Sequence, residues 1–568
     1  MISFAILTLL GLSVWGIYLF RRSLIALILK LPSRSHDVKV TKNIPIEMPD
    51  GIRLFCDHYA PECEENLPTI LIRTPYGRRT ISVFVRCFAE RGYHVIVQDV
   101  RGRFDSEGEY DPFVNEAADG KATLEWLAEN RWFNGALGTW GLSYLGYVQW
   151  AIAADAPPFL KAMLPIMVGP QVFTSTYPDG AFGLCLRVSS TYGVYFKTQF
   201  IEQPMGKKIS LLISMFLGRE AHKLKEAFDH LPIEEADVIV TGKRDPFYRN
   251  ILVHPHAENA FWKSRDHTVS LSQVNAAVHL MGGWYDLYLR EVLDTYSTLK
   301  TGGKNPYLTV GPWHHAQLRP NLEGVKSGLN WFDAHLKSDC SRLREKPVRI
   351  YVMGLHEWRE MEKWPPPAFE TLFFLYPEAR LMSEAPVSSS SLDRYRYNPA
   401  DPTPAVGGAF LDRKGAGPKN NRLLEDRLDV LCYTTPPLVN DVEVIGSVRL
   451  ALFVRSNLAH TDFFARLCHV DAKGRSVNVC DGLFRIEPGK GELQPDGSLR
   501  IEVDMWATAY GFQRGHRFRL QVSSGAHPRW SRNLGTGDPL GTGTHMEVAE
   551  QAIYHDAKHP SALILPIT

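Results

Sequence analysis

An alternation of short apolar runs with helical segments, between residues 44 and 353, constrains the fold of this chain most strongly. The runs are bounded by turn-forming residues, which is typical of strands buried on both faces of a sheet. Because strands that alternate with helices pair in parallel, we predict an α/β fold around a parallel sheet. A hairpin is expected over 44–59, strands over 69–72, 93–99, 137–140, 278–281, 307–310 and 348–353, and helices over 83–90, 115–129, 287–300 and through Trp331.

The alternation is interrupted once and is lost after Trp364, which divides the chain into parts. A chain of 568 residues is too long for one hydrophobic core. Helical spacing at 209–217 and 224–231 indicates an inserted segment, and short strands separated by Gly, Pro and Asp turns indicate a C-terminal sandwich. The predicted parts are an N-terminal segment over 1–34, an α/β domain over 35–170 and 270–357, a helical cap over 171–269 and an all-β domain over 366–568.

The N-terminal segment contains an uncharged apolar run of 18 residues, from Ser3 to Phe20. This is the lower limit for crossing about 30 Å of hydrocarbon. The run lacks a preceding basic stretch and a following small-x-small cleavage site, so it predicts a membrane anchor. Arg21, Arg22 and Lys30 follow it, and the positive-inside rule then places the body of the protein in the cytoplasm. A signal peptide with an exported body, or a buried core helix, are the alternatives.

The composition argues against several classes of function. Charged residues make up 22% and hydrophobic residues 45% of the chain, which is an ordinary globular balance. The formal net charge is +1 and no long basic run interleaves with aromatic residues, so we expect no nucleic-acid partner. The eight cysteines form no CxxC pair, which argues against a zinc ribbon and a dense disulfide framework.

The segment Thr139–Gly146 carries the candidate nucleophile. It follows an apolar strand and precedes a helix-like run over 147–154, and Ser143 stands between Gly141 and Gly146. A serine at such a strand-to-helix turn presents its hydroxyl at the top of the sheet, where a base can reach it. The second glycine comes one place later than in the usual G-x-S-x-G pattern. Taken alone, the motif therefore also fits a tight packing turn without chemistry.

A serine nucleophile needs a base and an orienting carboxylate, which in this type of fold follow in the chain order Ser, acid, His. Asp286 ends the segment Leu280–Asp286 directly after an expected strand, and His314 and His315 follow the next one. The carboxyl ends of parallel strands gather reacting groups at one edge of the sheet. These positions predict a catalytic triad of Ser143, Asp286 and one of the two histidines.

At this point the residues resemble a known family, the cocaine-esterase-like and X-Pro dipeptidyl-peptidase serine hydrolases. The later position of the second glycine is typical of that family. The resemblance extends from about Ile44 to the C-terminus. The matching motifs are Arg73-Thr-Pro-Tyr76, Gln98-Asp-Val-Arg-Gly102, Ser106-Glu-Gly108, Gly141-Leu-Ser-Tyr-Leu-Gly146, Gly283-Trp-Tyr-Asp286 and Gly311-Pro-Trp-His-His315.

The resemblance implies an α/β-hydrolase body, a helical cap and a C-terminal jelly roll. It implies Ser143 as nucleophile, Asp286 as orienting acid and His315 as base, because the matching base stands two residues beyond the Trp of Gly-Pro-Trp. It also implies an oxyanion hole formed by the Tyr76 hydroxyl and the backbone amide of Tyr144.

We therefore predict a serine hydrolase that cleaves an ester or amide acyl bond through an acyl-enzyme on Ser143. Its partners would be small-molecule esters or amides, or short peptides, and the membrane through the N-terminal segment. The steps require no metal and no organic cofactor. An X-Pro dipeptidyl aminopeptidase and a catalytically idle hydrolase fold that binds a partner are the alternatives.

Overall fold

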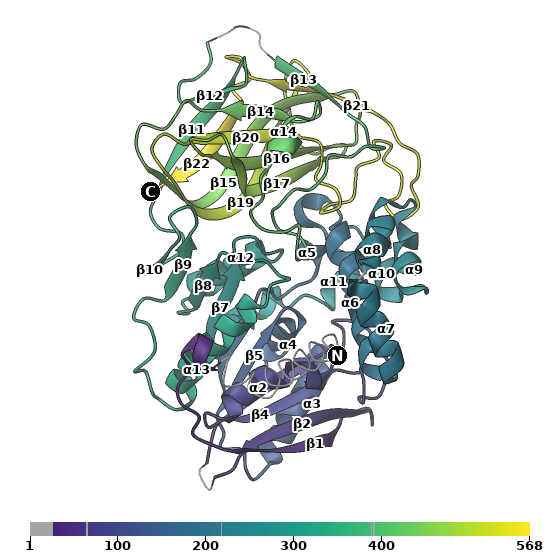
Figure 1. Ribbon diagram of the computed structural model, residues 1–568, viewed down its shortest axis with the longest axis vertical. Coiled ribbons are helices and arrows are strands. Elements are labelled where there is room, and N and C mark those ends of the chain that lie inside the picture. Colours follow the sequence, from purple (N-terminus) through teal and green to yellow (C-terminus); the bar gives the residue numbers. More distant parts are fainter. Residues whose placement is uncertain (1–25, 64–65, 217, 388, 390–391) are drawn as a thin grey trace, which may run out of the picture.

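The computed structural model describes residues 26–63, 66–216, 218–387, 389 and 392–568, which form two large sheets and a group of helices (Figure 1). Ten strands make up the first sheet, in the order β1-β2-β4-β3-β5-β6-β7-β8-β9-β10. The seven strands from β3 to β9 pair in parallel. They are β3 (Thr69–Thr74), β4 (His94–Asp99), β5 (Leu137–Leu142), β6 (Leu160–Ile166), β7 (Ala277–Gly283), β8 (Tyr307–Gly311) and β9 (Val348–Val352).

Antiparallel strands flank this parallel core on both sides. They are β1 (Val38–Glu47), β2 (Arg53–Pro61) and β10 (Glu357–Met361). The helices that connect the parallel strands are α2 (Ser82–Ala89), α3 (Glu116–Glu129), α4 (Tyr144–Ala153), α12 (Leu289–Thr301) and α13 (Arg319–Leu336). The expected alternation of strands and helices is therefore present, and because the core is parallel, the carboxyl ends of its strands meet at one edge.

One strand of the parallel core was not predicted. Strand β6 contains Lys161 and Pro165 within an otherwise apolar run, and proline argues against a central strand because it cannot donate a ladder hydrogen bond. The structure accommodates Pro165 at the carboxyl end of β6, opposite Gly141 of β5.

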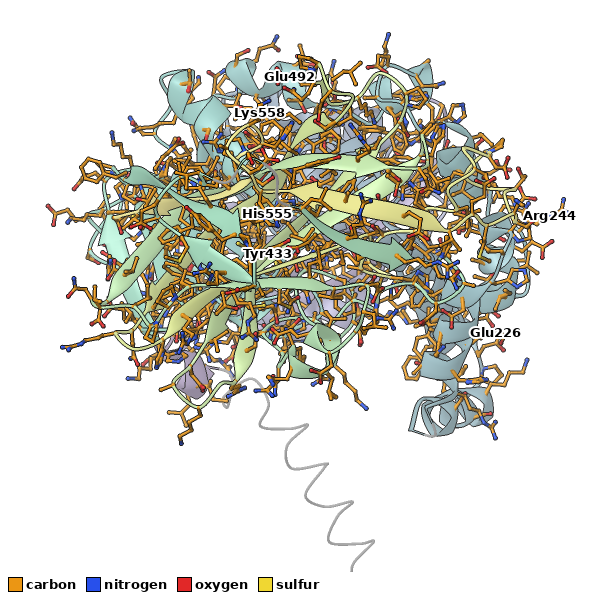
Figure 2. All side chains as sticks on the ribbon, turned by 90° about the horizontal axis from the view of Figure 1, so that it is seen from above. Glu226, Arg244, Tyr433, Glu492, His555 and Lys558 are labelled. Atoms are coloured by element: carbon orange, nitrogen blue, oxygen red, sulfur yellow. The ribbon has the colours of Figure 1, made fainter. Side chains whose placement is uncertain are left out.

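The helical cap lies beside the first sheet (Figure 1). Its elements are α5 (Phe173–Thr176), α6 (Leu184–Glu202), α7 (Met205–Phe216), α8 (Arg219–Asp229), α9 (Ala236–Thr241), α10 (Pro246–Val253) and α11 (Ala260–Lys263). The two predicted helices correspond to α7 and α8, whereas α6 was not predicted. Figure 2 shows the cap at the side of the molecule, with Glu226 and Arg244 on its surface.

The C-terminal region is built from strands that belong to a second, twelve-stranded sheet. The strands are β11 (Phe369–Tyr376), β12 (Arg380–Met382), β13 (Leu392–Tyr397), β14 (Leu431–Thr434), β15 (Val442–Ser456), β16 (Thr461–Val470), β17 (Ser476–Ile486), β18 (Glu492–Leu493), β19 (Leu499–Phe512), β20 (Arg517–Ser523), β21 (Ala549–Tyr554) and β22 (Ala562–Ile567), and the short helix α14 (Arg422–Glu425) precedes β14. Tyr433 and His555 lie in this region (Figure 2) and both contact the Asp393 carboxylate, at 2.7 and 3.0 Å. The expected fold class, an α/β-hydrolase domain with inserted helices and a C-terminal all-β domain, is confirmed. We propose that the α/β-hydrolase domain consists of residues 35–170 and 270–357, the helical cap of 171–269, and the all-β domain of 366–568.

The all-β domain packs directly on the α/β domain. The backbone N–H of Met353 donates to the Ala509 carbonyl at 2.8 Å, and the N–H of Gly511 donates to Met353 at 2.7 Å. Tyr285, in the loop after β7, donates its hydroxyl to the Asn478 carbonyl at 3.3 Å. The all-β domain therefore backs the loop that carries Asp286.

The predicted membrane anchor is corrected by the described chain. No helix in the described residues, from 26 onward with the gaps given above, is long and apolar enough to cross a membrane. A span needs about 20 predominantly apolar residues, whereas α6, at 19 residues, carries Arg187, Lys197 and Glu202. The run Ser3–Phe20 itself lies outside the described residues. Where the description begins, Leu29 is buried in the core of the α/β domain and Leu31 packs against it.

Candidate active site

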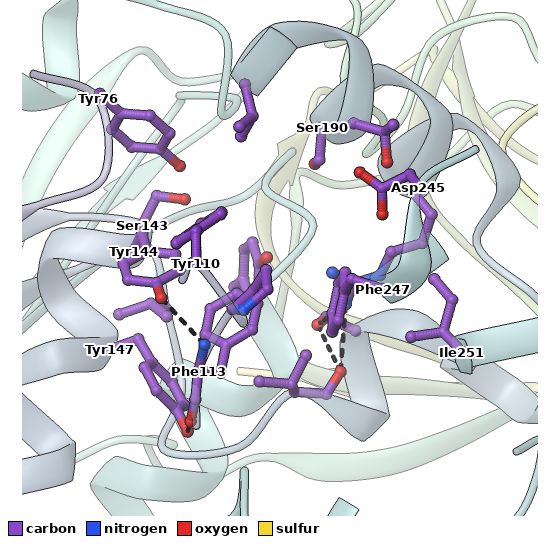
Figure 3. A pocket seen from close by; sticks show the side chains of 18 of the residues that line it. Tyr76, Tyr110, Phe113, Ser143, Tyr144, Tyr147, Ser190, Asp245, Phe247 and Ile251 are labelled. Atoms are coloured by element: carbon purple, nitrogen blue, oxygen red, sulfur yellow. Dashed lines mark hydrogen bonds between the residues drawn. The ribbon is translucent and has the colours of Figure 1, made fainter. Parts of the chain in front are cut away.

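Ser143 occupies the sharp turn between β5 and α4. Its backbone has φ 60° and ψ −125°, a conformation that few non-glycine residues adopt. Its N–H donates to the Ile166 carbonyl at 2.8 Å, and its own carbonyl accepts from Gly146 and Tyr147 at 2.7 and 3.0 Å. These bonds hold the turn so that the hydroxyl faces a cavity (Figure 3).

The two glycines of the motif are required by close packing around this turn. A Cβ atom at Gly141 would lie 2.3 Å from Leu145 Cβ, and one at Gly146 would lie 2.4 Å from Val168 Cγ1. Both distances are too short for real carbon contacts, so strand and helix approach only because these side chains are absent. The later position of the second glycine thus matches the place where α4 passes Val168.

Asp286 and His315 are joined across the loops that follow β7 and β8. The Asp286 Oδ2 atom lies 2.9 Å from His315 Nδ1, and Oδ1 accepts the backbone N–H of Tyr288 at 2.9 Å. Asp286 is completely buried. The two loops also touch through the backbone, since the N–H of Tyr285 donates to the Trp313 carbonyl at 3.0 Å. The carboxylate is therefore fixed and shielded from water, and it orients the imidazole of His315.

The two adjacent histidines face different surroundings. The ring of His315 contacts the ring of Tyr288, with centroids 5.3 Å apart. His314 is buried, lies close to Gly417 of the all-β domain, and its Nδ1 atom has no hydrogen-bond partner among the described residues. Burial lowers the pKa of His314. Of the two, only His315 is hydrogen-bonded to Asp286, which is the contact that orients the base in a catalytic triad.

Tyr76 lies beside Ser143. Figure 3 shows its hydroxyl pointing toward the Ser143 side chain. Burial raises the pKa of Tyr76 to about 12, and the nearby Tyr288 adds to this rise, whereas the interaction with Ser143 opposes it. The hydroxyl therefore keeps its proton at neutral pH and can donate a hydrogen bond. Because Tyr144 is the first residue of α4, its backbone N–H is one of the helix-end donors that have no acceptor within the helix.

A buried chain of contacts holds the side chain of Tyr144. The Tyr144 hydroxyl donates to Glu116 Oε1 at 2.7 Å and accepts from the N–H of Phe113 at 3.0 Å. Arg73 pairs with the other oxygen of Glu116 at 3.0 Å. Sequence reasoning missed Glu116, because an acidic residue in the first turn of a helix is common and nothing local marks it. Arg73 opens one of the family motifs, but its partner is visible only in the fold.

The cavity in front of Ser143 is formed jointly by the α/β domain and the cap (Figure 3). Its empty space amounts to about 780 Å³, part of which is open to solvent. Aromatic side chains make up much of its wall, and polar groups come mainly from the cap. The lining includes Tyr76, Tyr110, Phe113, Tyr144, Tyr147, Phe247 and Tyr288, together with Ser175, Arg187, Ser190 and Asp245. His315 adjoins the cavity through its contact with Tyr288. A largely apolar cavity with a few polar groups suits a small organic substrate.

Two family descriptions match the chain. X-Pro dipeptidyl-peptidase (S15 family) matches residues 50–317, and the X-Pro dipeptidyl-peptidase C-terminal non-catalytic domain matches residues 343–564. The first match contains Ser143, Asp286 and His315 and the whole cap, and the second contains most of the all-β region.

Curated relatives match between 78% and 93% of the chain. Cocaine esterase of Rhodococcus sp. (strain MB1 Bresler) is 33% identical over 572 residues, which cover 93% of this chain and 98% of the relative. A putative serine esterase of Mycobacterium bovis is 24% identical, and the match covers 84% of this chain and 89% of that relative. A putative Xaa-Pro dipeptidyl-peptidase of Bacillus anthracis is 21% identical, and the match covers 78% of this chain and 70% of that relative.

Solved structures share the fold over the same extent. An α-amino acid ester hydrolase superposes with a TM-score of 0.77 at 21% identity, covering 95% of this chain and 98% of that one. An aminopeptidase from a marine sediment Thaumarchaeota archaeon superposes with a TM-score of 0.76 at 22% identity, covering 94% and 97%.

Proposed function

Because the chain belongs to the cocaine-esterase-like and X-Pro dipeptidyl-peptidase family of serine hydrolases, we propose that Ser143 forms an acyl-enzyme with a small ester. In this reaction the Ser143 hydroxyl attacks the carbonyl carbon, and His315 takes the hydroxyl proton through its Nε2 atom. The proton then passes to the leaving alcohol. Water, activated by the same imidazole, releases the acyl group and regenerates Ser143.

Three further groups carry the other parts of the proposed mechanism. Asp286 accepts a hydrogen bond from the Nδ1–H of His315, with 2.9 Å between the nitrogen and oxygen atoms, which leaves Nε2 free as the base and stabilises the imidazolium that forms. The Tyr76 hydroxyl and the Tyr144 N–H donate to the oxyanion of the tetrahedral intermediate. Tyr76 is suited to this role because it remains protonated at neutral pH.

The observation that carries the proposal is the contact between His315 and Asp286, made at the same sheet edge where Ser143 stands in its strained turn. A hydrolase fold kept only for binding has no need of a buried carboxylate held against an imidazole, or of a serine held in an unfavourable backbone conformation. These features favour catalysis over the idle alternative.

The second candidate function is release of an X-Pro dipeptide. The carboxylate of Asp245 lines the cavity and favours this candidate, because a peptide substrate brings a positively charged amino terminus. We rank it below esterase activity, because the relative named as an esterase matches at 33% identity and the one named as an Xaa-Pro dipeptidyl-peptidase at 21%.

A direct comparison of substrates tests this order. The kcat/KM values of the purified protein are measured for 4-nitrophenyl acetate and butyrate and for Gly-Pro and Ala-Pro 4-nitroanilides. We expect turnover of the esters and much slower turnover of the anilides, with both removed by Ser143→Ala. Faster turnover of the anilides, lowered selectively by Asp245→Asn, would support the aminopeptidase instead.

A further inference from the structure

The cavity that contains Ser143 also contains a buried arginine that the proposed mechanism does not use. Arg187 lies near the start of α6, in the cap, and only 4% of its surface is exposed. It lines the same cavity as Ser143, Ser175 and Tyr288. Its charge therefore lies in the wall of the cavity that a substrate would occupy.

The guanidinium of Arg187 is only partly satisfied by the protein. Its Nη2 group donates to the Val172 carbonyl at 3.2 Å and to Ser175 Oγ at 3.0 Å. Its Nε atom is buried and has no hydrogen-bond partner within the described part of the chain. Both bonds go to neutral oxygens, and no ion pair between Arg187 and a carboxylate is present among the described residues. A guanidinium has five N–H donors, so most of its donor capacity remains available.

Two acidic residues lie near this charge, Glu291 beside the guanidinium and Asp245 in the cavity wall, and neither forms an ion pair with Arg187. Burial raises the pKa of Glu291 to about 8, so this carboxyl is mostly protonated at neutral pH. The Asp245 carboxylate accepts the N–H of Tyr248 at 2.8 Å and caps α10, and its charged neighbours are Asp237 and Lys243. A buried cation without a counterion is costly, and proteins normally pair such a group or place it where a ligand pairs it.

Arg187 also lies close to the catalytic groups. Ser175, which accepts a hydrogen bond from Arg187, is also a neighbour of the Tyr288 side chain. The ring of Tyr288 in turn contacts the ring of His315 at 5.3 Å. Two residues in contact with each other, Ser175 and Tyr288, thus link the guanidinium to the imidazole of the proposed base.

We propose that Arg187 binds a carboxylate group of the substrate, so that the enzyme prefers esters that carry a negative charge. This inference rests on the proposed esterase function. A carboxylate would complete the hydrogen bonds of the guanidinium and supply the missing counterion. Specificity would follow, because a neutral ester of the same shape leaves the buried cation unpaired.

The test uses matched pairs of esters. In the first arm the charge is on the acyl side. Mono-4-nitrophenyl esters of straight-chain dicarboxylic acids, from succinate to suberate, are compared with the same esters after methylation of the free carboxylate. In the second arm the charge is on the alcohol side, and 4-carboxyphenyl acetate is compared with phenyl acetate. We expect kcat/KM for the acid to exceed that for its neutral partner by at least about 30-fold in one of the arms. The arm that responds identifies which part of the substrate meets Arg187.

Variants separate recognition from folding. Arg187→Met should abolish the preference for the acid while changing kcat/KM for the neutral ester far less, and Arg187→Lys should retain part of it. Asp245→Asn, which removes a negative charge from the same cavity, should not reduce the preference. Melting temperatures of all variants are compared with that of the wild type.

Two results would overturn the inference. One is a wild-type protein whose kcat/KM is equal for neutral and acidic esters in both arms. This result does not depend on the folding of any variant. The other is a parallel loss of both activities in Arg187→Met, which would indicate a purely structural arginine. Absence of Ser143-dependent turnover of any ester would instead reject the proposed function itself.

Discussion

His315 Nδ1 and Asp286 Oδ2 lie 2.9 Å apart, and the carboxylate that makes this contact is completely buried. The adjacent His314 is turned toward the all-β domain, near Gly417. The two imidazoles therefore have different surroundings, and of the two only His315 is hydrogen-bonded to Asp286. This pairing distinguishes two chemically identical side chains, and the proposed catalytic role falls to His315.

The first prediction follows from this division. His315→Ala should lower kcat for 4-nitrophenyl acetate by several orders of magnitude, because the proposed base is removed. His314→Ala should keep most of the activity, and its effect should appear in the melting temperature, since a buried side chain is lost. Steady-state kinetics and thermal melts of both variants check this. An essential His314 with a dispensable His315 would contradict the assignment.

Two tyrosines beside Ser143 allow a matched comparison. Tyr76→Phe should lower kcat by about 10²- to 10³-fold with little change in KM, because the lost donor acts on charge that develops in the transition state. An unchanged kcat would show that Tyr76 is only packing.

Tyr144→Phe should behave in the opposite way. The proposed oxyanion donor of Tyr144 is its backbone N–H, which the substitution retains, but the Glu116 carboxyl loses the hydrogen bond that it accepts from the Tyr144 hydroxyl at 2.7 Å. Stability should fall by about 1–3 kcal/mol, because a buried acceptor loses its partner. Denaturant unfolding measures the loss, and the kcat of the folded variant should stay close to that of the wild type. A fall in kcat as large as that of Tyr76→Phe would argue against this separation.

The stability of the protein should depend on pH through Glu291. Burial raises its pKa from 4.5 to about 8, and the negative charge of Asp286 acts in the same direction. The folded state therefore holds a proton that the unfolded state releases between these two values. The associated stability is fully present below pH 4.5 and is lost as the pH rises through 8.

Glu291→Gln removes this dependence, because the amide does not titrate. The melting temperature of the variant relative to the wild type should rise between pH 5 and pH 8, reflecting a difference on the order of a few kcal/mol. Glu258→Gln, at an exposed position of the cap, serves as the control and should show no such trend. A constant difference for Glu291→Gln across this range would contradict the prediction.

The parts of the fold that follow from local patterns could be predicted from the sequence. Buried parallel strands are continuous apolar runs, and Ser143 is marked by its glycines and by its place between a strand and a helix. The fold class, the family resemblance and the serine hydrolase function are confirmed. The catalytic triad and the oxyanion hole remain proposals, supported by the contacts described here.

What could not be predicted depends on distant partners. Strand β6 carries a proline that argues against a central strand, and α6 mixes polar and apolar residues on several faces because it touches both the cavity and its neighbours. Glu116 and Arg187 have no local pattern at all, since their roles come from contacts with Tyr144 and with the cavity. The N-terminal anchor was inferred from an apolar run and the residues that flank it, and this pattern does not distinguish a membrane span from other apolar segments.

Covalent labelling tests the central claim, that Ser143 is an activated nucleophile. The folded protein is treated with a fluorophosphonate probe, and the modified peptide is identified by mass spectrometry after digestion. We predict one equivalent of probe on Ser143, complete loss of labelling in Ser143→Ala, and retained labelling in Ser190→Ala, which removes another serine that lines the same cavity. Undiminished labelling of Ser143→Ala, or an unlabelled Ser143 in a protein that still hydrolyses esters, would contradict the account.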